Sequence, residues 1–206
     1  TVKIHIKLDT GMSRIGLICQ TEEQCAIAAD TAQRIANMDA FVPEGIFTHF
    51  AVADEAEDGE ACTLRQFRCF MSVVEELKRR GVSIPLRHCC NSGAVLDYPQ
   101  MSLDMVRCGV ILYGLFPSTK IRRHIDLRPA MQLKSVVSML KTVNPGTAVS
   151  YGCTYHTQAS TKIATVPIGY ADGYSRNLSS RAEMLVHGKR VPIIGRICKI
   201  GRASCR

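Results

Sequence analysis

The segment TVKIHIKLDTGMSRIG (residues 1–16) decides the first element of the fold. Its first nine residues alternate between apolar and polar side chains, which is the period-two pattern of a β-strand with one buried face. The apolar face consists of Val2, Ile4, Ile6 and Leu8, and the polar face consists of Lys3, His5, Lys7 and Asp9. The pattern therefore predicts a strand with one apolar face, and it leaves open why the other face carries so much charge.

Strand and helix patterns alternate through the first half of the chain. Residues 21–38 predict a helix with Thr21 as its N-cap, and residues 64–81 predict an amphipathic helix ending at Gly81. Strands are predicted at residues 43–51, 84–90 and 105–114, and a short helix at residues 92–98. The alternation favours a parallel sheet, and functional side chains near the strand ends favour a (β/α)8 TIM-type barrel. Because we count only about four to five β/α units, we interpret residues 1–128 as the C-terminal portion of such a barrel.

Near Pro129 the alternation of strand and helix patterns ends. Residues 129–198 contain short β-rich segments separated by turns at Asn144–Gly146 and His187–Gly188, with no long helix pattern. This predicts part of a second, all-β domain. The fold class is therefore α/β: a partial barrel followed by a partial β domain.

The composition excludes several classes of function. The net charge of +8 allows nucleic-acid binding, but the basic residues are scattered and accompany no nucleic-acid motif, so we expect none. No apolar run approaches the length of a membrane span, so no membrane association is expected. The 10 cysteines include no C-x-x-C pair, which favours free thiols in a reduced cytoplasmic protein and no metal site.

Seven sequence blocks, in order, resemble the alanine racemase family. They are KLDTGMSRIG, THFAVADE, HCCNSGAVLDYP, DMVRCGVILYG, VSYGCTYHT, VPIGYADGYSR and IIGRIC. Such a series is more specific than any single motif. The resemblance implies a homodimeric enzyme that interconverts L- and D-alanine through a pyridoxal 5′-phosphate (PLP) aldimine by two-base proton transfer. It also implies that the D-alanine serves peptidoglycan synthesis.

The resemblance assigns cofactor contacts to two groups of residues. Arg107 matches the arginine that donates to the pyridine nitrogen, and because arginine keeps its proton, that nitrogen would stay unprotonated. His49 matches the histidine that supports this arginine beside the ring. The phosphate is expected to lie against Asn91, Ser92, Gly109 and Val110.

Other matched positions concern the substrate. Lys7 resembles a lysine that is carbamylated by CO2, and the resulting anion would hold Arg14 toward the substrate carboxylate. Tyr151 resembles the tyrosine that reaches into the site of the partner subunit and acts there as a base on one face of the substrate. Tyr170 resembles the tyrosine that narrows the substrate entrance. The corridor through which the substrate enters is expected to be lined by Asp54, Arg176 and Arg196.

The chain departs from the family pattern at both ends. The lysine that forms the Schiff base with PLP has no counterpart, so we expect this chain alone to be inactive. After Cys198 the family continues with Met-Asp, whereas this chain has Lys199 and Ile200. We interpret residues 199–206 as a non-native tail, since KIGRASCR can be back-translated into a string that resembles a sequencing-adapter read. Simple divergence is the other explanation.

Two alternatives to alanine racemase remain open at this point. One is a non-catalytic PLP-binding barrel protein, although such proteins generally lack a β domain. The other is a broader amino-acid racemase, for example one that acts on serine.

Overall fold

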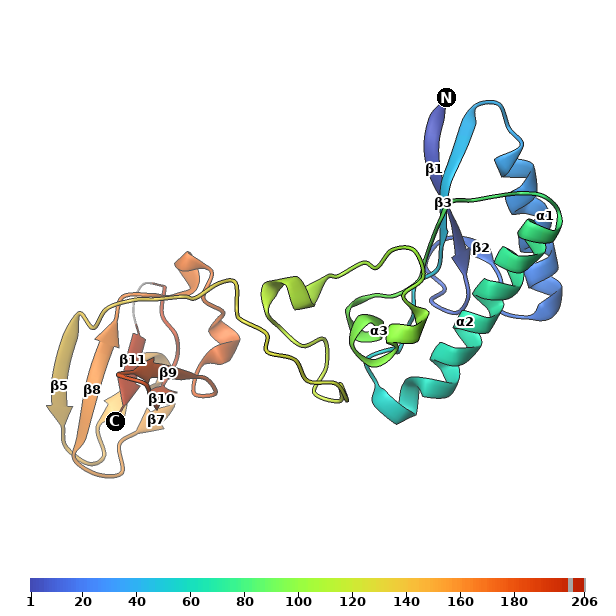
Figure 1. Ribbon diagram of the computed structural model, residues 1–206. Coiled ribbons are helices and arrows are strands. Elements are labelled where there is room, and N and C mark those ends of the chain that lie inside the picture. Colours follow the sequence, from blue (N-terminus) through green and yellow to red (C-terminus); the bar gives the residue numbers. More distant parts are fainter. Residues whose placement is uncertain (200–201, 206) are drawn as a thin grey trace. The chain divides into compact units, whose positions relative to one another are not determined.

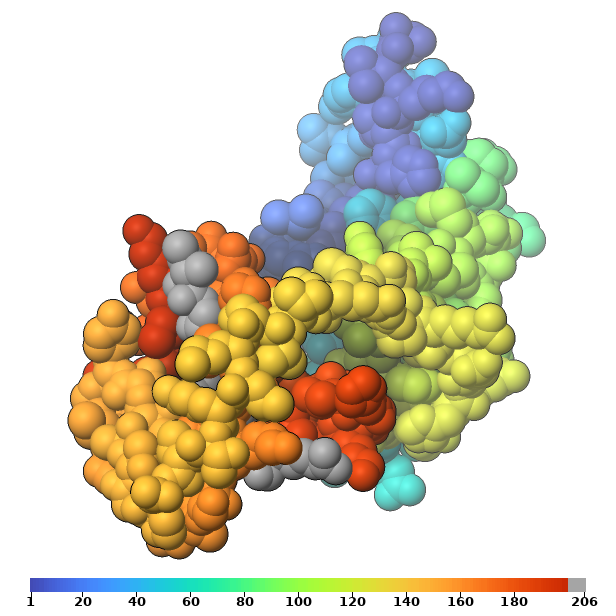
Figure 2. Space-filling model, turned by 90° about the vertical axis from the view of Figure 1, so that its left-hand side faces the viewer, coloured from blue at the N-terminus to red at the C-terminus, as the bar shows by residue number. Residues whose placement is uncertain are grey.

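The computed structural model describes residues 1–199 and the backbone of residues 202–205. The chain divides into two compact units, Thr1–Met131 and Gln132–Arg206 (Figure 1). The stretch that leads to the boundary, residues 122–131, is almost entirely exposed and appears in yellow-green and yellow on the surface in Figure 2. Each unit has its own sheet.

Unit 1 contains a parallel sheet with the strand order β2-β1-β3-β4. Its strands are β1 (Val2–Asp9), β2 (Leu17–Ile18), β3 (Phe41–Phe47) and β4 (Leu86–His88). Its helices are α1 (Glu22–Ala36), α2 (Ala56–Arg79), α3 (Ser92–Asp97), η1 (Pro99–Met101) and η2 (Val110–Tyr113). The parallel sheet with alternating helices agrees with the predicted fold class.

The core of unit 1 lies between the sheet and the helices α1 and α2, which pack side by side against it (Figure 1). Ile6 and Leu8 of β1 and Phe70 of α2 are at most 4% exposed there, so the predicted apolar face is largely confirmed. Burial of each such side chain stabilises the fold by about 1.5–3 kcal/mol. Val2 is the exception, because it lies at the free end of the strand and is 60% exposed.

The two long helices have ends that the sequence predicts well. The Thr21 side chain accepts a hydrogen bond from Gln24 N at 3.3 Å, which is the predicted N-cap of α1. At the end of α2, Gly81 has a φ of +78°, and the N–H groups of Gly81 and Val82 donate to the carbonyls of Lys78 and Leu77. This pair of bonds is a Schellman motif, and a side chain other than glycine would be strained there.

The predicted start of α2 at residue 64 is wrong, because the helix begins at Ala56. Its first two turns are mostly polar and therefore lack the apolar periodicity used for the prediction. Two acidic residues of the first turn, Glu57 and Asp58, stabilise this end through the helix dipole.

The strand predicted at residues 105–114 is also wrong. Residues 105–109 have no regular structure, and Val110–Tyr113 form the 3-10 helix η2. Asp104 N and Arg107 N donate to the carbonyls of Arg87 and Cys90, so this segment runs parallel to β4 and its continuation. Two isolated bonds are too few for a ladder, but they position Arg107.

Unit 2 is built from antiparallel β-structure, as predicted. Its larger sheet has the order β5-β8-β11-β10-β9, and β6 and β7 form a separate pair. The strands are β5 (Met139–Val143), β6 (Ala148–Val149), β7 (Tyr155–His156), β8 (Thr161–Val166), β9 (Glu183–Val186), β10 (Lys189–Ile194) and β11 (Arg202–Cys205). The 3-10 helices are η3 (Tyr151–Cys153), η4 (Tyr170–Asp172) and η5 (Arg176–Leu178). His187 and Gly188, with φ of +49° and +76°, form the predicted β9–β10 turn.

The predicted non-native tail begins at Lys199. The backbone of Arg202–Cys205 pairs with β8 and β10, while residues 200, 201 and 206 lie outside the described part of the chain. Backbone pairing depends little on side chains, so the interpretation of these residues stays a prediction.

Candidate functional site

The centre of the candidate site in unit 1 is the guanidinium group of Arg107. Its Nη1 lies 2.5 Å from His88 Nδ1, and its Nη2 donates to Thr48 O at 2.7 Å and to Cys89 O at 3.2 Å. His49 Nδ1 lies 3.3 Å from the same Nη2. Burial lowers the pKa of Arg107, but a guanidinium stays charged in proteins, so its N–H groups can only donate. Arg107 also lines a cavity, where a remaining N–H of its guanidinium can donate to a ligand.

His88 is a residue of this site that the sequence did not reveal. It ends β4, is 3% exposed and stacks on the Phe47 ring, with centroids 4.9 Å apart and planes at 4°. Burial, followed by the charge of Arg107 and then by His5, lowers its pKa to about 4. A neutral His88 can therefore accept the hydrogen bond from Arg107. The only signal in the sequence was its place within the strand predicted at residues 84–90.

His49 lies against Arg107, as the resemblance implied, and it is held through its backbone. Gln66, fully buried on α2, donates to His49 O and to Thr10 Oγ1, both at 3.2 Å, and accepts from Ala51 N at 2.9 Å. Burial lowers the pKa of His49, and the charges of Arg107, Arg14 and Lys7 lower it further. Gln66 is thus a second residue of the site that sequence reasoning missed.

Lys7 and Arg14 add positive charge beside Arg107. The pKa of Lys7 is lowered by burial first and then by Arg14, and Arg107 also contributes. Asp9 Oδ1 accepts from Gly11 N at 3.1 Å and from Ser13 N at 2.9 Å, which folds the turn that carries Arg14. A cluster of like charges of this kind favours a bound anion.

A cavity of about 270 Å³ opens beside these groups, slightly below the usual range for small-molecule pockets of roughly 300–1,000 Å³. It is lined by His49, Asp54, Asn91, Ser92, Gly93, Arg107, Gly109, Val110 and Pro117. The structure therefore brings together seven of the residues that the sequence singled out. A larger cavity of about 470 Å³ lies at the C-terminal end of α2, but apolar residues form most of its wall and it contains none of the predicted residues.

One end of the smaller cavity presents small groups and hydrogen-bond donors. Ser92 Oγ accepts from Gly109 N at 2.9 Å, which leaves the hydroxyl proton free to donate into the cavity. Asn91 acts as the N-cap of α3, since its Oδ1 accepts from Ala94 N at 3.1 Å. A phosphate-bearing aromatic cofactor fits this arrangement, because Ser92 and Gly109 offer room and a donor and Arg107 offers a donor for a ring nitrogen. Among the described residues, no group of three or more metal-ligating side chains could hold a metal ion.

In unit 2, Tyr151 lies on an unusual turn. Three residues around it have positive φ, namely Ser150 at 67°, Gly152 at 74° and Cys153 at 47°. The Tyr151 side chain is 71% exposed. Such strain outside glycine costs roughly 1–3 kcal/mol per residue and concentrates at functional sites.

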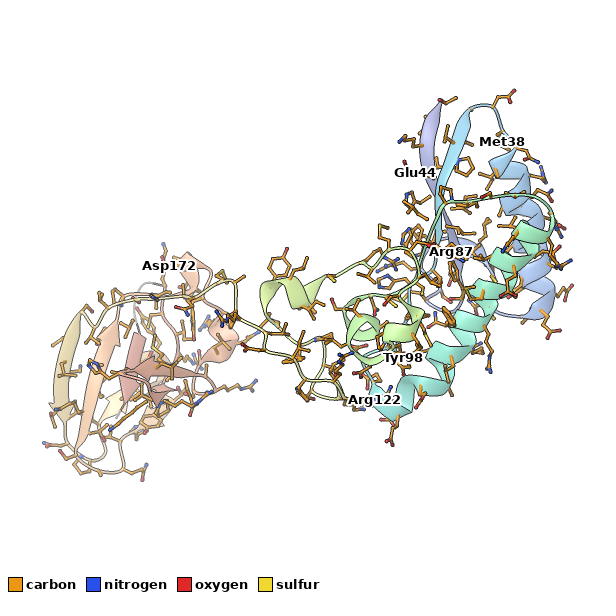
Figure 3. The ribbon with its side chains drawn as sticks, in the orientation of Figure 1. Met38, Glu44, Arg87, Tyr98, Arg122 and Asp172 are labelled. Carbon is orange, nitrogen blue, oxygen red and sulfur yellow. The ribbon has the colours of Figure 1, made fainter. Side chains whose placement is uncertain are left out.

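The segment from Gly195 to Lys199 gathers the other predicted residues of unit 2. Arg196 O accepts from Ser150 Oγ at 2.6 Å, next to Tyr151, and Cys198 O accepts from Tyr170 N at 3.1 Å. In a third contact, Ile197 N donates at 3.0 Å to Ser179 Oγ, and this hydroxyl donates to Arg176 O. Tyr151, Tyr170, Arg176 and Arg196 are thus held around one segment. The turn of Tyr170 is closed by Asp172, labelled in Figure 3, which accepts from Gly169 N at 2.9 Å.

The fold and site define a two-unit α/β protein whose parallel sheet carries a small polar cavity and whose second unit is antiparallel. The family model "Alanine racemase, N-terminal domain" matches residues 1–117, and "Alanine racemase, C-terminal domain" matches residues 130–199. The chain belongs to the alanine racemase family.

Individual relatives agree with this assignment. The alanine racemase of Desulfovibrio desulfuricans is 48% identical over 198 residues, which is 96% of this chain and 51% of that protein. The solved alanine racemase of Clostridium difficile 630 superposes with a TM-score of 0.86 at 38% identity, covering 99% of this chain and 52% of that one. The Bacillus anthracis alanine racemase with bound L-Ala-P gives a TM-score of 0.80 at 36% identity, covering 99% and 51%. The chain spans about half the length of the relatives it matches.

No helix among the described residues has both the length and the apolar character needed to cross a membrane.

Proposed function

We propose that this chain is part of an alanine racemase that interconverts L- and D-alanine with PLP as its cofactor. The observation that carries the proposal is the position of the Arg107 guanidinium, which is held by hydrogen bonds at the wall of a cavity that Ser92 and Gly109 also line. The family assignment supports the same reaction.

The cavity residues would divide the binding of the cofactor between them. Ser92 and the backbone around Gly109 and Val110 would hold the phosphate, and Arg107 would donate to the ring nitrogen. When bound, PLP acts as an electron sink that makes the Cα proton of an amino acid acidic. Because Arg107 is held by acceptors on several sides and cannot release its proton, it would keep the ring nitrogen unprotonated. An unprotonated ring is a weaker electron sink, which disfavours side reactions such as transamination.

Racemisation requires proton transfer on both faces of the substrate carbon. Tyr151 would remove or return the proton on one face, and the strained, exposed turn that presents its hydroxyl supports this role. Tyr170, Asp54, Arg176 and Arg196 would shape the approach of the substrate. The lysine that the family joins to PLP is not among the residues of this chain, so we expect the 206-residue chain alone to be inactive.

Arg14 would bind the substrate carboxylate, with Lys7 as its support. Burial and neighbouring cations lower the pKa of Lys7, which increases the fraction of neutral amine that can react with CO2. The carbamate would replace a cation by an anion beside Arg14 and relieve the repulsion within the cluster.

The remaining features of the function concern the assembly and the cell. The family assignment supports a homodimer in which each subunit completes the site of the other, with Tyr151 acting in the site of the partner subunit. The nine cysteines with described side chains are free, which supports a cytoplasmic location. The product D-alanine would supply peptidoglycan synthesis. The C-terminal family match ends at residue 199, which is the first residue of the proposed non-native tail at residues 199–206.

The test is to express the full-length racemase that carries this chain and to measure D/L interconversion of alanine with added PLP, with serine as a parallel substrate. We expect activity with alanine and a loss of about 10²–10⁴-fold in kcat for Tyr151→Phe. Absence of PLP uptake, seen as absorbance in the near-ultraviolet to violet range, would refute the proposal. Faster turnover of serine than of alanine would replace it by a broader racemase.

A further inference from the structure

A line of polar side chains continues from Arg107, away from the cavity, to the surface of unit 1. Arg107 Nη1 lies 2.5 Å from His88 Nδ1, and His88 Nε2 lies 2.8 Å from His5 Nδ1. His5 Nε2 in turn lies 3.8 Å from Glu44 Oε2. Glu44, labelled in Figure 3, also accepts from Lys3 Nζ at 2.8 Å, and both of these side chains are more than a third exposed. The line thus connects the candidate site to the solvent side of β1 and β3.

Only one arrangement of protons satisfies every contact in this line. Arginine has donors and no acceptor, so His88 Nδ1 must accept from Arg107 and His88 must carry its proton on Nε2. That proton can be donated only to His5 Nδ1, which lies 2.8 Å away. A neutral His5 then carries its own proton on Nε2, on the side of Glu44. The direction of donation therefore runs from Arg107 outward.

Strand β3 is shaped to hold the two imidazole rings. The register between β1 and β3 shifts between Ile4 and His5, and His5 lies opposite Gly45. A Cβ atom at Gly45 would overlap the His5 ring, so only glycine leaves room for it. Two residues further on, on the same face of the strand, Phe47 stacks on His88. The two imidazoles meet edge to face with centroids 5.1 Å apart.

We propose that His5 is a positioning residue, which holds His88 in the Nε2–H tautomer and thereby keeps the Arg107 guanidinium aimed at the cavity. The ligand that Arg107 meets rests on the proposed function, but the proton order is a property of this chain alone. The titratable or charged groups that face His88 are Arg107 on one side and His5 on the other. A proton added to His88 Nδ1 would point at Arg107 and break the contact.

The tautomers can be measured directly in the chain labelled with ¹⁵N. Long-range ¹H–¹⁵N correlation spectra distinguish the protonated from the accepting ring nitrogen, and single substitutions assign the histidine signals. We expect His88 to be the Nε2–H tautomer and the N–H groups of Arg107 to exchange slowly with water. In His5→Leu, which cannot accept from His88 Nε2–H, we expect a mixture of His88 tautomers and faster exchange at Arg107.

Two further variants separate positioning from a simple loss of packing. In His5→Gln the amide oxygen can accept from His88, so the wild-type tautomer and slow exchange should return. Gly45→Ala keeps His5 but displaces its ring, so it should reproduce the effect of His5→Leu. His156→Leu, in unit 2, is the control and should change neither readout.

An Nδ1–H tautomer of His88 in the wild type would overturn the proposal. So would a folded His5→Leu protein with unchanged His88 signals, and if that variant does not fold, unchanged signals in Gly45→Ala would do the same. These readouts need neither cofactor nor turnover. A racemase with the wrong proton order would therefore refute this inference alone, and the right order without racemase activity would refute only the proposed function.

Discussion

Acid should destabilise unit 1 through the protonation of His88. His88 is 3% exposed, and burial, Arg107 and His5 lower its pKa to about 4, whereas an unfolded histidine titrates near 6.5. The unfolded chain therefore binds a proton that the folded chain excludes. The stabilisation is fully present above about pH 6.5 and is lost as the pH falls toward about 4. The His88 pKa in the folded chain lies about 2.5 below its value in the unfolded chain. This gap corresponds to roughly 3 kcal/mol in the free energy of unfolding.

The assay is urea unfolding followed by far-ultraviolet circular dichroism at several pH values between about 4 and 7. The α-helices of the described residues all lie in unit 1, so this signal reports on the correct unit. The matched variant is His88→Asn, because its amide oxygen can still accept from Arg107 but the side chain does not titrate. Carboxylates with lowered pKa, such as Asp104, contribute equally to both proteins. We expect the wild type to lose about 3 kcal/mol more than the variant over this range, and parallel curves would refute the reasoning.

Three further predictions concern the same unit. Gln66→Leu removes the hydrogen bonds that Gln66 makes to Ala51 N, Thr10 Oγ1 and His49 O. It should therefore lower the free energy of unfolding by about 2–4 kcal/mol. A loss below about 1 kcal/mol would contradict the buried network. Lys7 should give a ¹³C carbamate signal in labelled bicarbonate at mildly alkaline pH, because its pKa is lowered, and the signal should be absent in Lys7→Ala; a bare amine in the full-length active enzyme would exclude the modification. Ser92→Ala should weaken binding of PLP by about 10–100-fold, as expected for a lost hydrogen bond to a charged group. Binding of pyridoxal, which lacks the phosphate, should stay unchanged. Equal losses for both ligands would place the phosphate elsewhere.

Local patterns were sufficient for much of the fold. The alternation in residues 1–9 predicted β1, Thr21 predicted the cap of α1, and Gly81 predicted the end of α2. The His187–Gly188 turn was predicted equally well. Each of these features depends on residues that are neighbours in the chain, so their spacing alone carries the information.

The prediction failed where contacts at long range decide the conformation. Residues 105–109 have the apolar character of a strand, yet only two backbone bonds join this segment to β4 and its continuation. The polar first turns of α2 were missed because their helical state depends on charge at the helix end and not on an apolar face.

For the site, the sequence by itself determined the family, the identity of most cavity residues and the charged face of β1. Motifs and periodicity depend on residues that are neighbours in the chain, so they can be recognised without a structure. Only the tertiary structure decided how these residues act on each other. His5 and His88 are separated by 83 positions, and Gln66 reaches Thr10 across 56. These hydrogen bonds exist because the fold places β1 next to β3 and β4 in one sheet and packs α2 against that sheet. No local pattern encodes which side chains of these distant segments then lie within reach.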